Sequence, residues 1–205
     1  MTAPLEILPT GAWTDPDERH HKFDAGLAGS LAEFFSRYGF YHPLVDIIDL
    51  GCGPGRYVKS LNDCSKFVLA VGYDGNPNLR FIDGSACMVC DLTKEPYLCE
   101  AKDWILCLEL GEHVPVEYEE AVWGHLGQAK TGVIISWAPP GQGGHGHFNC
   151  REPAYIGEKM AELGFVEGKP DFFRNRSTLP WFKTNLRVFL RPECEAVAKR
   201  LEELA

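Results

Sequence analysis

The sequence is poor in basic residues. It has 20 Lys and Arg against 29 Asp and Glu, so its formal net charge is −9. Nonspecific nucleic-acid binding needs cations that replace the counterions of phosphate, so this charge argues against a nucleic-acid partner. The chain also lacks an apolar run of membrane-spanning length and the charged-then-apolar order of a signal peptide. We therefore expect a cytoplasmic protein without a membrane partner, acting on a neutral or cationic small molecule.

The arrangement of the eight cysteines argues against a four-cysteine zinc site and against a disulfide framework. Only one C-x-x-C pair is present, at Cys87 and Cys90, and a four-cysteine zinc site would require a second. Most of the cysteines lie in apolar stretches, as Cys107 does within the run 104–108. We predict free, buried thiols that act as small hydrophobes, without a disulfide framework.

Two nucleotide-binding motifs are missing. The phosphate-binding pattern G-x-x-x-x-G-K-[ST] does not occur, and Arg56 stands where the dinucleotide pattern G-x-G-x-x-G needs its third glycine. Instead, the run 49–55 reads DLGCGPG and follows the apolar run 44–48. Glycine tolerates positive φ and has no Cβ, so this turn can bring backbone close to a ligand. The pattern predicts a strand, a tight turn and a helix that open a nucleotide-binding α/β sheet.

The DLGCGPG run resembles motif I of the class I S-adenosylmethionine (SAM) dependent methyltransferases. The resemblance covers roughly residues 40–191. It implies a Rossmann-like fold, SAM as the cofactor and S-adenosylhomocysteine (SAH) as the product.

The order of patterns along the chain predicts alternating strands and helices. Apolar runs predict strands at 44–50, 67–73, 86–90, 104–108, 132–137, 165–167 and 185–191, and helical spacing predicts helices at 23–38, 56–62, 117–129, 153–163 and 193–204. A full helix at 75–85 is not expected, and a long loop should precede the last strand. Such alternation is typical of an α/β fold with helices on both faces of a mostly parallel sheet. The resemblance implies seven strands.

We interpret residues 1–205 as a single methyltransferase domain. Residues 1–40 would form an N-terminal lid and helix, 41–191 the SAM-binding core, and 192–205 the C-terminal helix.

Acidic residues end the predicted strands, where ligands of open α/β sheets bind. Asp74 follows the second strand, and the resemblance implies that it accepts both ribose hydroxyls of SAM. Asp91 follows the third, and the resemblance implies contact with the adenine amino group. The complete predicted cofactor set is Asp49, Gly51, Cys52, Gly53, Gly55, Asp74, Gly75, Asp91, Leu92 and Glu109.

Aromatic residues could contact the sulfonium of SAM through cation–π interaction. Trp137 and Tyr57 are candidates, and packing in the core is the favoured interpretation of Tyr57. A lid over the cofactor could come from the N-terminal residues Trp13, His20, Lys22 and Phe23.

After the fourth predicted strand, residues 109–115 follow the pattern E-x-x-E-H-V-P. This pattern resembles the same stretch of small-molecule O-methyltransferases of the ubiquinone-biosynthesis type. His113 could act as a general base with Glu112 beside it, because the unperturbed pKa of histidine lies near ~6.5. Alternatively, Glu109, Glu112 and His113 could hold Mg²⁺. The Asn/Asp-Pro-Pro-aromatic motif of base-amino methylases is absent, which argues against a nucleic-acid acceptor.

The loop 136–151 is rich in glycine and carries polar side chains. Long loops at this end of a sheet usually carry function. We interpret it as an acceptor-binding loop with Gln142, His145, His147, Asn149 and Arg151 as candidates, and we add His145 to the catalytic set.

The function that these patterns favour is SAM-dependent methyl transfer to oxygen or nitrogen of a small polar molecule. Two alternatives stay open: a SAM-binding or partner-activating module without turnover, and an aminopropyltransferase-like enzyme. The sequence does not identify the acceptor or the oligomeric state.

Overall fold

The computed structural model describes residues 6–15, 21–38, 44–94 and 102–204. One sheet of seven strands organises them, with the strand order β3-β2-β1-β4-β5-β7-β6. The strands are β1 (Val45–Leu50), β2 (Val68–Asp74), β3 (Cys87–Val89), β4 (Trp104–Leu108), β5 (Gly132–Ser136), β6 (Val166–Glu167) and β7 (Arg187–Leu190). β7 pairs antiparallel with β5 and β6, and the other pairings are parallel. The predicted fold class is confirmed.

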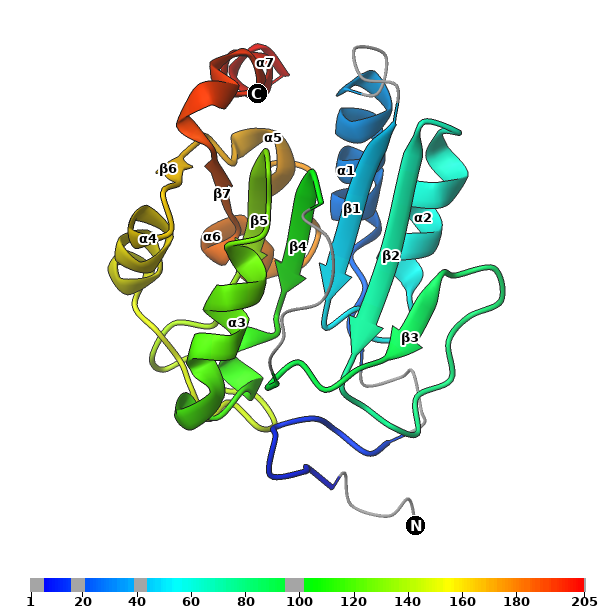
Figure 1. The fold of residues 1–205 in the computed structure, drawn as a ribbon, viewed down its shortest axis with the longest axis vertical. Coiled ribbons are helices and arrows are strands. Elements are labelled where there is room, and N and C mark those ends of the chain that lie inside the picture. The colour runs from blue at the N-terminus through cyan, green and yellow to red at the C-terminus, as the bar shows by residue number, and fades with distance from the viewer. Residues whose placement is uncertain (1–5, 16–20, 39–43, 95–101, 205) are drawn as a thin grey trace.

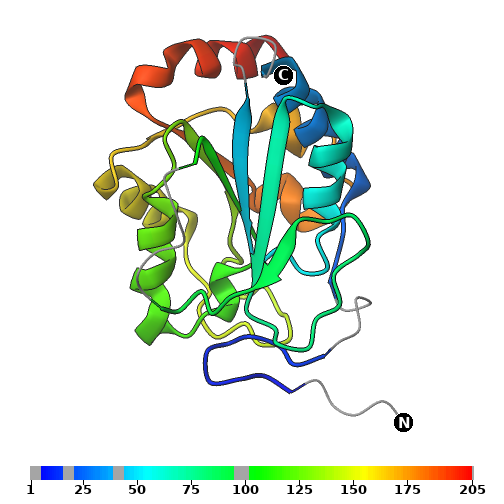
Figure 2. The same ribbon diagram turned by 45° about the vertical axis from the view of Figure 1, so that its right-hand side comes forward.

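Helices cover both faces of the sheet (Figures 1 and 2). Alternate residues of a strand point to opposite faces, so Ile47 of β1 belongs to one core cluster and Ile48 to the other. The Ile47 cluster contains buried residues of α1 (Ala25–Tyr38), α2 (Arg56–Cys64), α5 (Asp171–Arg174), α6 (Pro180–Asn185) and α7 (Glu195–Leu204). The Ile48 cluster contains those of α3 (Glu119–Leu126) and α4 (Pro153–Glu162).

The predicted long loop before the last strand is wrong, because it contains the short helices α5 and α6. These helices bury three phenylalanines, Phe172, Phe173 and Phe182, against the sheet. Helices of four and six residues are too short to show a helical period in the sequence. The expected absence of a full helix at 75–85 is confirmed.

The cysteines only partly follow the prediction. The seven that lie in the described residues are free, as expected. However, only Cys52 and Cys107 are buried, and the other five are half-buried. None of the helices in the described ranges is long and apolar enough to cross a membrane.

Candidate active site

The glycine turn after β1 has the positive φ angles that its sequence permits. Gly51, Gly53 and Gly55 have φ of 72°, 52° and 89°, in the left-handed region that favours glycine. A Cβ atom on Gly53 would lie only 2.7 Å from Nδ1 of His21. A side chain at position 53 would therefore have to displace His21, and the backbone of Gly51 and Gly53 lies at the wall of a cavity.

Two cavities lie beside this turn, at the carboxyl ends of the parallel strands. They share a wall that includes Trp13, Gly51, Glu109 and His113. The larger cavity has a volume of about 390 Å³. The smaller one is lined on the far side by residues 74–75 and 91–93.

Most of the predicted cofactor residues line these cavities. The predicted residues that line the smaller cavity are Gly51, Asp74, Gly75, Asp91, Leu92 and Glu109. Those that line the larger cavity are Asp49, Gly51, Cys52, Gly53 and Glu109. Gly55 lines neither. A Cβ atom there would lie 2.6 Å from Sγ of Cys87, so Gly55 permits close packing behind the turn.

Asp74 fixes the turn from the end of β2. Its Oδ2 atom accepts the Gly53 N–H at 2.8 Å, and its Oδ1 atom accepts the Asn76 N–H at 2.9 Å. Each carboxylate oxygen has two lone pairs, so Asp74 can still accept hydrogen bonds from a ligand in the cavity. Contact with ribose hydroxyls stays a prediction.

Asp91 is held beside the smaller cavity by local contacts. Its Oδ1 atom accepts both the backbone N–H and the hydroxyl of Thr93, and its Oδ2 atom pairs with Lys94 at 2.9 Å. Leu92 is buried next to it. The side of the cavity near Asp91 therefore combines a fixed carboxylate with an apolar surface, which suits a planar heterocycle with an amino group.

Asp49 is a buried carboxylate at the rim of the larger cavity. Its side chain is 1% exposed, and its Oδ2 atom has no hydrogen-bond partner among the described residues. Burial raises the pKa of this carboxyl well above its usual range, and the nearby Cys87 and Asp74 add to the shift. An unpaired buried carboxylate is costly, so this position is suited to a cationic group.

The half-buried Glu109 and the buried Glu112 form a pair of acids after β4. Glu109 has a φ of 54°, which is uncommon for a residue with a side chain, and its N–H donates to Oγ of Ser136 at 2.9 Å. Burial raises the pKa of Glu109, and burial together with the charge of Glu109 raises the pKa of Glu112 well above its usual range. Neither oxygen of Glu112 has a hydrogen-bond partner within the described part of the chain. The raised pKa values of these two neighbouring acids favour binding of a proton or a cation between them.

His113 and His147 lie next to Glu112. One ligand atom from each of the three residues lies within 4.8 Å of the others. Nδ1 of His113 lies 3.1 Å from the Gly146 carbonyl oxygen, and Nδ1 of His147 lies 3.1 Å from that of Gln142. A carbonyl oxygen only accepts, so each Nδ1 carries a proton and each neutral ring has its lone pair on Nε2. Burial and the nearby His147 lower the pKa of His113 to about 4, which keeps that ring neutral.

This arrangement corrects the metal-ligand set expected from the sequence. Glu112, His113 and His147 form the compact group, and Glu109 lies beside it rather than in it. His145 also lies outside the group, with its ring 6.2 Å from that of Trp13 on the wall of the larger cavity. The histidine spacing H-x-H gave only a weak signal, because sequence does not show which loop histidine meets the residues after β4.

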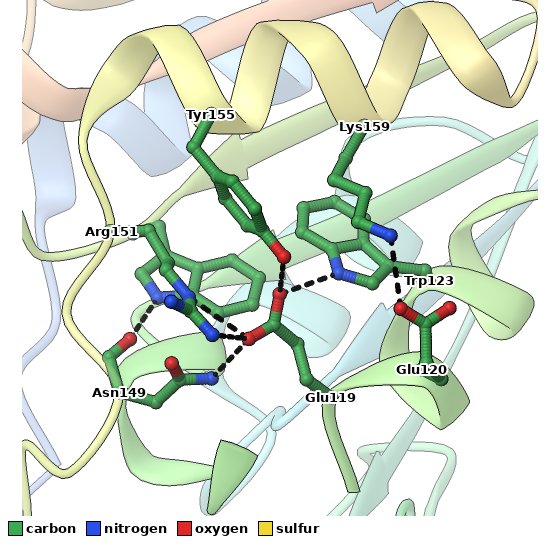
Figure 3. Close-up of polar contacts among 8 residues, drawn as sticks. Glu119, Glu120, Trp123, Asn149, Arg151, Tyr155 and Lys159 are labelled. Atoms are coloured by element: carbon green, nitrogen blue, oxygen red, sulfur yellow. Dashed lines mark hydrogen bonds and ion pairs between the residues drawn. The ribbon is translucent and has the colours of Figure 1, made fainter. Parts of the chain in front are cut away.

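Two of the predicted acceptor-binding residues serve the protein itself. The side chains of Asn149 and Arg151 both donate to Glu119, a buried residue that the sequence analysis did not single out (Figure 3). Gln142 lines the larger cavity, but its Oε1 atom accepts from Asn185. Neither Asn149 nor Arg151 lines the two cavities, so the acceptor-binding interpretation is wrong for both.

The predicted aromatic contact to a sulfonium is wrong for Trp137. This residue is 4% exposed, stacks on Trp123 at 5.1 Å between ring centroids, and lines neither cavity beside the turn. Its Nε1 atom donates to the Asn149 carbonyl oxygen at 2.6 Å. Tyr57 packs in the core as favoured, with one edge at the larger cavity.

The N-terminal stretch 6–15 lies at the carboxyl ends of the strands, and its role as a lid over a cofactor stays a prediction. Figures 1 and 2 show it passing beneath the carboxyl ends of the strands. Trp13 lines both cavities, and Lys22 and Phe23 line the larger one. The centroid of the Trp13 ring lies 5.2 Å from that of the His113 ring. His20 lies outside the described residues.

Comparison with known proteins identifies the fold. No family model and no curated protein matches the sequence. Among solved structures, the chain is similar to magnesium protoporphyrin IX methyltransferase from Synechocystis PCC 6803 with bound SAH (TM-score 0.58, 18% identity, covering 80% of this chain and 81% of that one). The chain has the class I methyltransferase fold.

Other solved structures with this methyltransferase fold differ in what their names say they methylate. The sugar N-methyltransferase KedS8 from Streptoalloteichus sp ATCC 53650 gives a TM-score of 0.56 at 14% identity, covering 85% of this chain and 90% of that one. The small RNA methyltransferase HEN1 gives 0.56 at 15% identity, covering 84% of this chain and 27% of that one. The methyltransferase fold therefore leaves the acceptor of this chain open.

Proposed function

We propose that this chain is a SAM-dependent methyltransferase that transfers a methyl group to oxygen or nitrogen of a small polar molecule in the cytoplasm. The observation that carries the proposal is Asp49, a buried carboxylate whose Oδ2 atom has no hydrogen-bond partner in the described residues, at a cavity beside the glycine turn. SAM carries an ammonium group and a sulfonium, and a cationic ligand would remove the cost of burying Asp49.

The residues around both cavities fit the remaining parts of SAM. Asp74 keeps free lone pairs that can accept ribose hydroxyls, and Asp91 with Leu92 offers an acid and an apolar surface for adenine. Gly51 and Gly53 line the larger cavity, so their backbone can contact a ligand there. When bound, SAM supplies an electrophilic methyl group to the acceptor.

The chain contributes positioning and removal of a proton. Methyl transfer is an in-line displacement, so holding the acceptor in the larger cavity should supply much of the rate. Nε2 of His113 has the lone pair that can accept a proton from the acceptor, because its Nδ1–H donates to Gly146. Trp13 lies over both cavities and would exclude water from them.

A divalent cation held by Glu112, His113 and His147 is the second way to activate the acceptor. Two imidazoles and one carboxylate suit a transition metal such as Zn²⁺, Mn²⁺ or Fe²⁺ better than Mg²⁺, which prefers oxygen ligands. Backbone carbonyls that hold Nδ1–H of both rings are the outer contacts that such ligands usually have. When bound, the metal would lower the pKa of an acceptor hydroxyl.

The test of the proposal is product formation. The purified chain is incubated with SAM labelled in its methyl group and with fractionated metabolite pools, and SAH and labelled product are quantified. We expect SAH to form in step with one labelled small molecule, and small RNA to compete weakly because the chain has a net charge of −9. SAM binding without SAH would instead indicate a partner-activating module, and turnover of decarboxylated SAM an aminopropyltransferase.

Replacing Asp74 with alanine should weaken SAM binding about tenfold or more, equivalent to at least ~1.4 kcal/mol. The change removes the acceptor of the Gly53 N–H as well as the predicted partner of the ribose. Isothermal titration calorimetry measures the affinity. Asp83→Ala is a control because Asp83 follows the same strand but lines neither cavity. Equal SAM affinity in the wild type and in Asp74→Ala would show that Asp74 does not bind the cofactor.

Removing divalent metal should slow turnover while leaving SAM bound. Incubation with a chelator followed by dialysis is expected to reduce the rate about tenfold or more, because the acceptor loses the cation that acidifies it. Adding back Mn²⁺ or Zn²⁺ should restore the rate more fully than Mg²⁺. A rate that is unchanged in the chelator would indicate that His113 acts alone as the base.

A further inference from the structure

The carboxylate of Glu119, at the start of α3, collects hydrogen bonds from three parts of the chain (Figure 3). Its Oε1 atom accepts from Trp123 Nε1 at 2.8 Å and from the Tyr155 hydroxyl of α4. Its Oε2 atom accepts from Asn149 Nδ2 at 2.8 Å and from the guanidinium of Arg151. Glu119 is only 3% exposed, so these contacts are shielded from water.

This cluster holds the far end of the loop that carries His147. Asn149 and Phe148 both donate their backbone N–H to the Glu112 carbonyl oxygen, at 3.0 and 2.8 Å. The Arg151 N–H donates to the Ala138 carbonyl oxygen at 3.1 Å, which closes the base of the loop. The contacts of Glu119 therefore reach Glu112 and the residue next to His147 through one short stretch of backbone.

The loop 139–148 contains little that could fix its own shape. It has glycine at 141, 143, 144 and 146, and most of its residues are exposed or half-buried. Yet it supplies the Gly146 carbonyl oxygen that accepts from His113, and it supplies His147 itself. Gln142 ties the middle of the loop to Asn185. Asn149 and Arg151, which Glu119 holds, anchor the end of the loop that follows His147.

We propose that Glu119 is a positioning residue: it fixes the loop so that His147 and the Gly146 carbonyl oxygen meet Glu112 and His113 in a geometry that can hold a metal. Hydrogen bonds to a carboxylate are about twice as strong as neutral ones, so the charge of Glu119 stiffens the cluster. Burial would raise the pKa of Glu119, but the hydrogen bonds from Tyr155, Asn149 and Trp123 outweigh it and lower the pKa. The proposal rests on the metal site described under the proposed function.

The experiment compares three variants of the full chain. Glu119→Gln removes the charge and keeps the size, and Asn149→Ala removes one of the two side chains through which Glu119 holds the end of the loop. Glu120→Gln is the matched control, because Glu120 is the neighbouring residue and its exposed pair with Lys159 joins the same two helices (Figure 3). Co²⁺ titration followed by visible absorption reports the geometry and affinity of the metal site, and calorimetry reports SAM affinity.

We expect Glu119→Gln and Asn149→Ala to weaken Co²⁺ binding about tenfold or more and to alter its absorption spectrum, as loss of outer contacts does at metal sites. SAM affinity should change less than about twofold, because the glycine turn and Asp74 lie outside the cluster. Glu120→Gln should change neither quantity. Unchanged Co²⁺ affinity in Asn149→Ala, or a parallel loss of Co²⁺ and SAM binding, would overturn the proposal.

Amide exchange separates this proposal from the metal site itself. If the wild-type chain binds no Co²⁺, the metal part of the proposed function fails, and the exchange rates of the Phe148 and Asn149 amides still report on loop anchoring. Exchange about tenfold faster in Glu119→Gln than in Glu120→Gln supports the positioning role. Equal exchange in the two variants rejects it.

Discussion

Replacing Asp49 with asparagine should make the ligand-free chain more stable and make it bind SAM about tenfold more weakly or worse. The variant removes a charge that is buried beside Asp74 without a hydrogen-bond partner for Oδ2 in the described residues, so the folded state no longer carries that cost. The same charge is what we propose the ammonium of SAM requires. Differential scanning fluorimetry measures the change in Tm, and calorimetry measures the change in affinity.

The gain in stability should depend on pH. The pKa of Asp49 is higher in the folded chain than in the unfolded one, so its carboxyl contributes stability below the ordinary value of 3.8. That stability is lost as the pH rises from about 3.8 toward the raised pKa of the folded state. The Tm advantage of Asp49→Asn should therefore be small near pH 4 to 5 and larger near pH 8.

Asp46→Asn is the matched control for this prediction. Asp46 belongs to the same strand, but it lies away from both cavities, half-buried and 3.7 Å from Lys102. The Oδ1 atom of Asp46 also has no hydrogen-bond partner in the described residues, so this variant removes a similar charge away from the cavities and should leave SAM affinity unchanged. If Asp49→Asn lowers the Tm at pH 8, or binds SAM as tightly as wild type, Asp49 does not hold a cationic part of the cofactor.

The other large effect is expected from the two histidines that meet Glu112. His113→Ala and His147→Ala should each reduce kcat about 100-fold or more, since each removes either the proton acceptor or a metal ligand. SAM affinity should change by less than about twofold. Single-turnover assays with labelled SAM measure the chemical step directly, and calorimetry measures the affinity.

His145→Ala is the control variant for this prediction. His145 lines the larger cavity but lies outside the group of Glu112, His113 and His147. Its loss should raise KM for the acceptor and reduce kcat less than about tenfold. Equal effects at 145 and 147 would mean that the loop histidines bind the acceptor, and loss of SAM affinity in His113→Ala would place His113 in the cofactor site.

The residues that line the cavities beside the glycine turn could be predicted closely because their positions depend on local sequence. The glycines at 51 and 53 adopt positive φ in a turn set by neighbouring residues, and Asp74 and Asp91 follow their strands directly. Parallel strands bring their carboxyl ends to one edge, so a residue's place in its strand already gives its place in the site.

The catalytic half could not be predicted in the same way because a long loop forms it. The sequence presents His145, His147, Asn149 and Arg151 as equivalent polar residues. In the structure, His147 lies close to Glu112, whereas Asn149 and Arg151 donate hydrogen bonds to Glu119. Glu119 gave no signal, because an acid in the first turn of a helix is ordinary in any sequence.

The amino-acid sequence by itself determined the sheet, its longer helices and the glycine turn, because hydrophobic period and glycine conformation act over a few residues. Only the tertiary structure decided which buried acids lack partners and which histidines meet. Burial and pairing depend on segments far apart in the chain, such as β4 and the loop after β5. Those contacts set the charges of Asp49, Glu112 and Glu119, and with them the chemistry that the site can perform.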